Sequence, residues 1–189
     1  AELIPLPQHG NRLPEVAETT AAVLLREMQQ LHNQHHQQNL QGIKISFGLV
    51  RIANIEPLVA IARRLISSSP AADFRIHYCV YHSQHPLAVR SHIEQRLDSL
   101  LTRYDPQAIW QAPEVRQSLN NFPEKNQLFV VIATAVAEVG RDHDYDWAIA
   151  EPSSVRSLIQ LAGRVRPHRP QVWESAHLLS PDQPPLGNG

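Results

Sequence analysis

Continuous apolar runs and helically spaced apolar residues alternate along this 189-residue chain. The runs that predict buried strands follow Gly42 and read KISFGLVRIAN, FRIHYCVY, LFVVIATA, WAIA and QVWESAHLL. The segments between them carry apolar residues at three- and four-residue steps, which predicts helices over EPLVAIARRLI, PLAVRSHIEQRLDSLLTRY and SVRSLIQLAGRV. Residues 105–127 show a looser pattern.

Strands that are apolar on both faces and separated by helices predict a parallel sheet covered on both sides, because crossover helices bury each face. The expected fold class is therefore α/β, a three-layer domain with a mostly parallel sheet and an N-terminal helix. We expect a helical or linker segment over 1–42, one domain over 43–180 and a flexible Pro/Gly-rich tail over 181–189. Ligands of such folds gather at the carboxyl ends of strands, so the loops after 54, 81, 133 and 151 are the places to search.

The N-terminal segment predicts an amphipathic helix that starts at Pro14. At its polar end, HNQHHQQ is expected to form a solvated, frayed turn rather than a metal site. The chain starts AELIPLP, without methionine or a signal pattern, so we expect it to be a piece of something longer.

The composition is that of an ordinary globular protein, with 42% hydrophobic and 19% charged residues. No apolar run reaches the roughly 18 residues that a membrane span requires. The one cysteine, Cys79, excludes a disulfide framework, is expected to be a buried small hydrophobe and fits a cytoplasmic location.

The net charge of −1 is unevenly distributed, because residues 152–170 are rich in arginine and contain no Asp or Glu. This stretch contains Arg156, Arg164, Arg166 and Arg169. Such a cluster attracts phosphate groups, although four solvated surface arginines would look the same.

The stretch GRDHDYD, residues 140–146, contains the His143–Asp144 pair. Adjacent His and Asp side chains can share a metal in phosphodiester hydrolysis, but such a site needs further ligands from neighbouring elements. The other histidines are scattered and supply no obvious set. A metal-dependent phosphohydrolase that uses RDHD stays open as an alternative, and our own expectation is that the chain holds no metal there.

The segments ATAVAEVGRDHDYD and QLAGRVRPHR lie about twenty residues apart and resemble motifs V and VI of superfamily 2 helicases. Together with the upstream segment CVYHSQHPLAVRSHIEQRLDSLL, they resemble the CRISPR-associated helicase-nuclease of type I-F systems. The likeness covers about residues 43–180. It implies the second RecA-like lobe of an ATP-dependent helicase that moves 3′ to 5′ on single-stranded DNA and is coupled to degradation of foreign DNA.

The resemblance assigns nucleotide chemistry to motifs V and VI. It makes Arg164 an arginine finger against the γ-phosphate and places Gln160 near the attacking water or the phosphate. Because Pro167 stands where the last arginine of motif VI would fall, either Arg166 or Arg169 would supply the second positive charge, or the site would use one finger. Residues implied on the ATP side are Gly140, Asp142 and Gly163.

The resemblance also implies a path for single-stranded DNA. Thr134 and the amides after it, starting at Ala135, would bind a phosphate without reading sequence. Asn54 matches an asparagine of motif IV, and His82 and Ser83 match a His-Ser pair along the DNA path. Gln84 departs from the arginine common in the next position, which weakens a phosphate contact there. By this match, His143 and Asp144 extend motif V as structural or DNA-side residues.

The chain contains no G-x-x-x-x-G-K-[ST] loop and no D-E-x-H segment. ATP and Mg²⁺ are therefore expected in the full-length parent and not on this chain alone, which should not turn over ATP. The implied partners are the first RecA-like lobe and the nuclease domain of the parent, the RNA-guided surveillance complex and the integration subunit. The alternative is a non-enzymatic RecA-like module that binds single strands or a protein.

Overall fold

The computed structural model describes residues 2–5, 13–102, 107–134, 143–151 and 176–180. The helices in this part are α1 (Leu13–Gln34), α2 (Ile55–Ser67), α3 (Leu87–Leu101), the short 3₁₀ helix η1 (Ala108–Gln111) and α4 (Pro113–Asn121). The strands are β1 (Glu2–Pro5), β2 (Gln37–Gln38), β3 (Lys44–Arg51), β4 (Phe74–Tyr81), β5 (Asn126–Ala133), β6 (Trp147–Ala150) and β7 (Ala176–Ser180).

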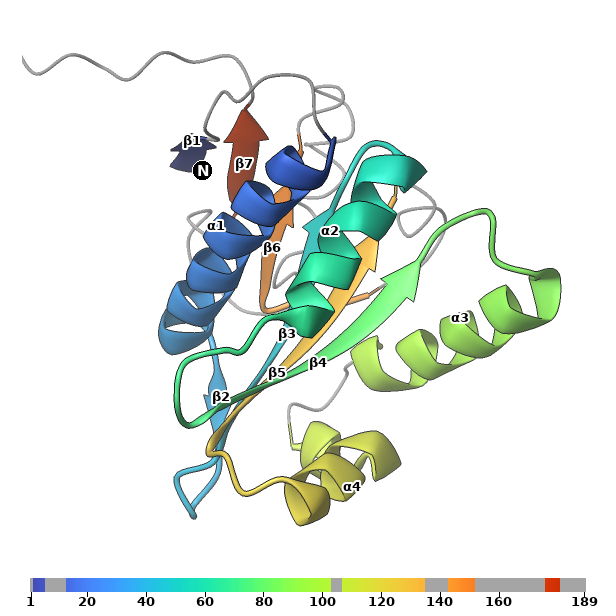
Figure 1. The fold of residues 1–189 in the computed structure, drawn as a ribbon. Helices are drawn as coiled ribbons and strands as arrows, with labels where there is room; N and C mark the ends of the chain where they lie inside the picture. Colours follow the sequence, from blue (N-terminus) through green and yellow to red (C-terminus); the bar gives the residue numbers. More distant parts are fainter. Residues whose placement is uncertain (1, 6–12, 103–106, 135–142, 152–175, 181–189) are drawn as a thin grey trace, which may run out of the picture.

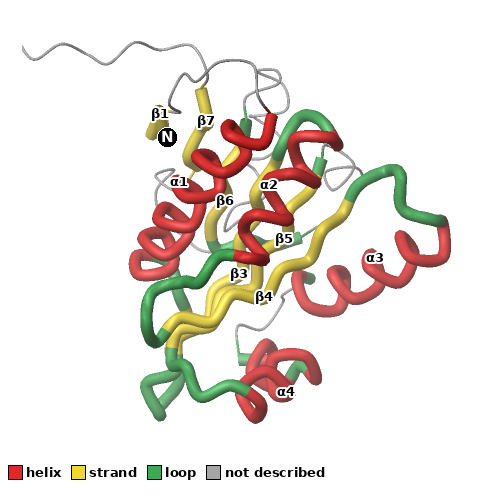
Figure 2. The backbone as a smooth tube through the Cα atoms, viewed as in Figure 1, coloured by secondary structure: helices red, strands yellow, loops and turns green. Residues whose placement is uncertain are grey.

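The strands form one sheet in the order β1-β7-β6-β3-β5-β4, with β2 added beside β3. All neighbours along this order pair in parallel, and only β2 runs antiparallel to its partner. Figure 1 shows α1 and α2 side by side over one face, and Figure 2 shows α3 and α4 beyond the other face. The predicted three-layer α/β class with a mostly parallel sheet is confirmed.

Several predicted elements agree closely with the observed ones. The strand predicted over FRIHYCVY is β4, and the helix predicted over 56–66 is α2. The looser region 105–127 differs, because it contains η1, α4 and the start of β5. The helix predicted over SVRSLIQLAGRV lies outside the described residues.

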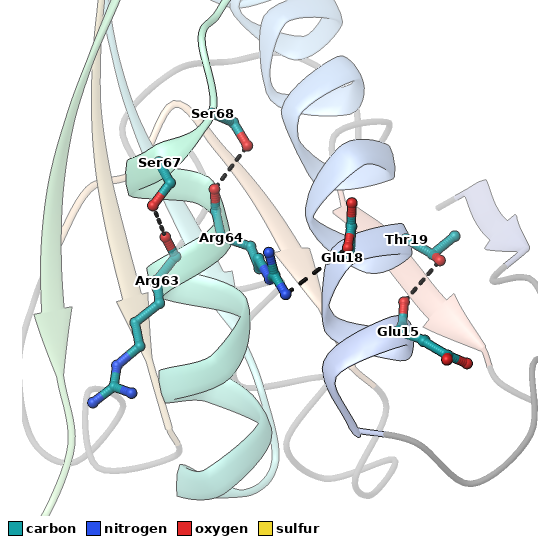
Figure 3. A network of polar contacts seen from close by, with 7 residues as sticks. All are labelled: Glu15, Glu18, Thr19, Arg63, Arg64, Ser67 and Ser68. Carbon is teal, nitrogen blue, oxygen red and sulfur yellow. Dashed lines mark hydrogen bonds and ion pairs between the residues drawn. The ribbon is translucent and has the colours of Figure 1, made fainter.

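Helix α1 packs into the core over the first face of the sheet. Its buried stripe consists of Ala17, Ala21, Leu24, Met28 and Leu31, which join the same apolar cluster as Leu58 and Leu65 of α2. At the surface, Arg64 of α2 pairs with Glu18 of α1 at 3.9 Å (Figure 3). This pair is exposed and contributes little to stability, so apolar burial holds the two helices together. No described helix has both the length and the apolar character of a membrane crossing.

The prediction for the histidine-rich end of α1 is wrong for His32, whose side chain is fully buried. Its Nδ1 lies 2.7 Å from Ser46 Oγ, and its Nε2 lies 3.3 Å from Asn126 Oδ1. Because the Asn126 amide oxygen only accepts, the proton of the neutral ring lies on Nε2, and Nδ1 accepts from the Ser46 hydroxyl, whose oxygen also accepts from Trp147 Nε1 at 3.0 Å. The polar sequence around His32 predicted an exposed side chain, whereas the residues that satisfy its buried ring lie on distant strands.

Trp147 occupies the space above Gly48, and its indole is completely buried. A Cβ atom at Gly48 would lie 2.1 Å from the Trp147 ring. Since β3 and β6 pair Gly48 with Trp147 directly, the missing side chain at Gly48 makes room for the indole.

We predict that Gly48→Ala destabilises the fold by about 3 kcal/mol, because overpacking a dense core forces side chains and backbone to shift. Urea unfolding of the wild type and the variant measures this difference. In a Trp147→Leu background the same substitution should cost much less, since the ring atoms that it meets are gone. An equal cost in both backgrounds would contradict this explanation.

We also predict that His32 makes stability depend on pH. Burial, the largest cause, lowers its pKa from 6.5 to about 4. Between these values the unfolded chain binds a proton that the folded chain does not, so stability is full above pH 6.5 and falls as the pH approaches 4. The loss should reach at most about 3 kcal/mol.

The measurement is the free energy of unfolding against pH for the wild type and for His32→Gln, which should lack this part of the decline. His92→Gln on the exposed surface of α3 is the matched control and should follow the wild type. Parallel curves for the wild type and His32→Gln would refute the role of His32.

Candidate functional site

Strands β3, β4, β5 and β6 end side by side. The register pairs Arg51 with Ala133 and Ala150, and pairs Ala133 with Tyr81. Thr134, the next residue after β5, still donates its N–H to the carbonyl of Tyr81 at 3.3 Å. We call the residues that follow these strands, 52–54, 82–83, 134 and 151, the carboxyl edge. The predicted DNA-side residues of the described part therefore lie along one edge of the sheet.

Asn54 stands at the N-cap position of α2 with an extended backbone, at φ −120° and ψ 147°. Its carbonyl accepts the N–H of Leu58 at 3.1 Å, but its side chain makes no capping hydrogen bond. An asparagine at this position ordinarily caps the helix with its side-chain oxygen. Here the exposed amide of Asn54 is left available for a ligand.

The loop after β4 brings His82 and Ser83 to the carboxyl edge. The ring of His82 stacks on His85, with centroids 3.9 Å apart and planes 17° apart, and His85 Nε2 donates to the carbonyl of Val80 at 3.1 Å. Burial, and to a lesser degree the charge of His85, lowers the pKa of His82. His82 is therefore a neutral, oriented ring, and Ser83 beside it is exposed.

Thr134 is 6% exposed, and its hydroxyl is buried. Within the described part of the chain, Thr134 Oγ1 has no hydrogen-bond partner. A buried hydroxyl without a partner is costly, so its presence at a candidate ligand edge points to a contact made with something else. The alternative interpretation, a strand-end threonine that satisfies its own turn, involves the residues after Thr134, which lie outside the described ranges.

Arg51 and Glu151 form a brace at the carboxyl edge that the sequence pattern did not predict. Arg51 is 2% exposed, and its Nη1 donates to the carbonyl oxygen of Glu151 at 3.2 Å. The Glu151 carboxylate accepts the N–H of Ala53 at 2.8 Å, and the Glu151 N–H donates to the Arg51 carbonyl at 2.9 Å. The brace fixes the loop that carries Asn54. A charged residue at the end of each of two apolar runs is the only sequence signal for it.

His143 has a structural contact in this fold. It is 2% exposed, and its Nε2 lies 2.7 Å from Asp98 Oδ1 on α3. Asp146 accepts the N–H of Phe47 through Oδ2 at 2.8 Å and returns its own N–H to the Phe47 carbonyl at the same distance. These contacts tie the segment before β6 to α3 and β3. Across the described ranges no group of three His, Cys, Asp or Glu side chains could hold a metal ion.

The remaining predicted site residues fall outside the described residues, together with Pro167. They are Ala135, Gly140, Asp142, Gln160, Gly163, Arg164 and Arg166. Their roles stay predictions.

Comparison with known proteins identifies the family of this chain. Residues 44–170 match the family described as CRISPR-associated nuclease/helicase Cas3, C-terminal. The chain is 54% identical over 169 residues to the CRISPR-associated nuclease/helicase Cas3 subtype I-F/YPEST of Pectobacterium atrosepticum. That alignment covers 89% of this chain and 15% of the relative, so the chain spans a small part of the relative's length.

Solved structures show the same fold at lower identity. The crystal structure of T. fusca Cas3 with AMPPNP superposes with a TM-score of 0.60 at 21% identity, over 96% of this chain and 18% of that one. A chain in a CRISPR RNA-guided surveillance complex, in a pre-nicking state, superposes with a TM-score of 0.57 at 21% identity, over the same shares of both chains. Because the family model matches more than half of this chain and the relative aligns with 89% of it, the chain belongs to the family described as CRISPR-associated nuclease/helicase Cas3, C-terminal.

Proposed function

We propose that this chain is the second RecA-like lobe of an ATP-dependent translocase on single-stranded DNA, coupled to nuclease degradation of foreign DNA in CRISPR interference. The observation that supports the proposal best is the parallel register, which aligns Asn54, His82, Ser83 and Thr134 along one edge of the sheet. Membership in the Cas3 family supports the proposed translocase activity and a cytoplasmic location.

In the proposed function, single-stranded DNA lies along the carboxyl edge. The Thr134 hydroxyl, which has no described partner, donates a hydrogen bond to a phosphate oxygen. The Asn54 amide and the Ser83 hydroxyl add uncharged contacts from the neighbouring loops. None of these groups contacts a base edge, so binding is independent of the DNA sequence, as a translocase requires.

The proposed nucleotide contacts come from motifs V and VI. Arg164 would place its guanidinium against the γ-phosphate, with Gln160 beside the attacking water and Arg166 as the second cation. Gly140, Asp142 and Gly163 would line the ATP side, and Ala135 would add a backbone N–H on the DNA side. ATP and Mg²⁺ supply the phosphoryl group and the charge neutralisation when they are bound in the parent protein.

This chain alone would be inactive under the proposal, because its sequence lacks the glycine-rich phosphate loop and the acidic magnesium motif. The preceding RecA-like lobe would supply both across a shared cleft. We further propose that the parent's nuclease domain, the RNA-guided surveillance complex and an integration subunit are its partners. The fold match to a chain in a surveillance complex supports the second of these.

We predict that Thr134→Val in the parent protein weakens single-stranded DNA binding about tenfold, the effect of losing one hydrogen bond to a charged group. Valine keeps the shape and removes a hydroxyl without a described partner, so the free energy of unfolding should stay the same or rise. Fluorescence anisotropy with a labelled oligothymidine and urea unfolding measure the two quantities.

Thr102→Val, on the exposed C-cap of α3, is the control and should leave DNA affinity unchanged. A loss of stability in Thr134→Val would show that the hydroxyl serves the fold. Unchanged DNA affinity in that variant would remove Thr134 from the DNA path.

We predict that Arg164→Ala in the parent protein lowers the ATPase rate at least about a thousandfold, the usual effect of losing an arginine finger. DNA affinity should be largely retained, because the side chain acts on the nucleotide. Arg156→Ala, in the same arginine-rich stretch but outside the motif, should keep wild-type turnover. Wild-type turnover in Arg164→Ala would contradict the finger assignment.

A further inference from the structure

A cavity of about 350 Å³ lies on the second face of the sheet, lined by residues of α3 and α4. The strand residues in its lining include Phe47, His77, Cys79 and Phe129, in the middle of β3, β4 and β5. The step from Cys79 to His82 is about 10 Å along the strand, so the cavity is separate from the carboxyl edge. We call it the aromatic pocket.

Three rings form the floor of the aromatic pocket. Phe47 stacks on Phe129 at 4.9 Å and 12°, and His77 stacks on the other side of Phe129 at 4.8 Å and 21°. These residues are direct cross-strand partners, and the ring spacing equals the spacing of strands, about 4.8 Å. The rings therefore stand upright from the sheet and turn their electropositive edges toward the cavity, which suits the face of a further aromatic ring.

A closed polar network forms one end of the pocket. Ser118 Oγ lies 2.6 Å from His77 Nε2 and 2.7 Å from Gln127 Oε1, and His77 Nε2 lies 2.8 Å from the same Gln127 oxygen. The Gln127 amide nitrogen donates to the carbonyls of Phe122 and Glu124, which fixes its oxygen toward the other two groups.

A carbonyl oxygen only accepts, so both the Ser118 hydroxyl and His77 Nε2 donate to Gln127. His77 therefore cannot take the proton of Ser118, and the pair is no nucleophile with a base. The lowered pKa of His77, caused mainly by burial, agrees with a neutral ring. The network therefore shapes one end of the pocket and holds His77 in place.

The pocket lining carries one arginine, Arg96, and one carboxylate, Glu114. Arg96 of α3 and Glu114 of α4 face each other across its lining, but Arg96 Nε and Glu114 Oε1 are 3.5 Å apart, longer than a good charge-assisted bond. The Arg96 side chain is 54% exposed, and this pair uses one of its several N–H groups. Arg75 adds a second cation, 3.8 Å above the ring of Phe122. An anionic group of a ligand would find unused donors here.

From this arrangement we infer that the aromatic pocket binds a planar aromatic group with a carboxylate, its ring on the Phe47–Phe129–His77 floor and its anion on Arg96. Its volume is at the small end of ligand sites, which fits a ligand of one or two rings. The inference does not depend on the proposed translocase function.

The single cysteine of the chain provides the test, because Cys79 is part of the lining. Burial raises the pKa of its thiol, so alkylation by N-ethylmaleimide is slow but measurable by mass spectrometry. Saturating 2-naphthoate should slow alkylation of the wild-type chain at least fivefold. The neutral analogue 2-naphthylmethanol should protect with about fivefold weaker apparent affinity, because it lacks the anion.

Arg96→Gln should remove this preference for the carboxylate, whereas Arg64→Gln, an exposed arginine on the opposite face, should preserve it. Protection by N-acetyl-Gly-Gly-Trp with a free carboxylate, in addition to naphthoate, would identify the end of a peptide as the occupant. Protection by naphthoate alone would identify a small molecule. No protection of wild-type Cys79 by any probe would overturn the inference, as would an unchanged preference in Arg96→Gln.

Discussion

The parallel register of β3 with its neighbours is the constraint on which both sites depend. Because Arg51 is aligned with Ala133 and Ala150, the loops after three strands leave the sheet at one level, and β4 adds a fourth through Tyr81. A shift of one strand by a single residue would exchange the side chains on its two buried faces and separate these loops. The same register stacks Phe47, Phe129 and His77 into the floor of the aromatic pocket.

Buried polar groups fix this register more specifically than apolar burial could. Asp146 holds the backbone of Phe47 through two hydrogen bonds, and the Arg51–Glu151 brace joins the ends of β3 and β6. His32 connects α1 to Ser46 of β3 and Asn126 of β5. Each group leaves a costly unpaired polar atom if its strand slips, whereas apolar side chains tolerate small displacements. These contacts join segments that lie far apart in the sequence.

Apolar runs and turn residues were sufficient to predict the fold class and the main strands. The strand FRIHYCVY and the helix after Asn54 were predicted almost to the residue, because strong local periodicity survives in the tertiary structure. The burial of His32 and the brace between Arg51 and Glu151 could not be predicted, since polar residues become buried only when distant partners satisfy them. For the carboxyl edge, strand ends located the loops, and the resemblance to helicase motifs selected Asn54, His82 and Thr134 within them. Only the structure could show which of these side chains lacks a described partner.

Helix α3 connects the carboxyl edge to the aromatic pocket. It follows the loop that carries His82 and Ser83, and its Leu97 and Leu101 form a wall of the pocket. Tyr81 donates to Glu94 near its middle, and His143 contacts Asp98 one turn further along. With polar contacts to both β4 and the segment before β6, the helix cannot slide without breaking at least one of them. The helix that lines the pocket and follows the His82 loop is thus held by contacts from two different segments of the chain.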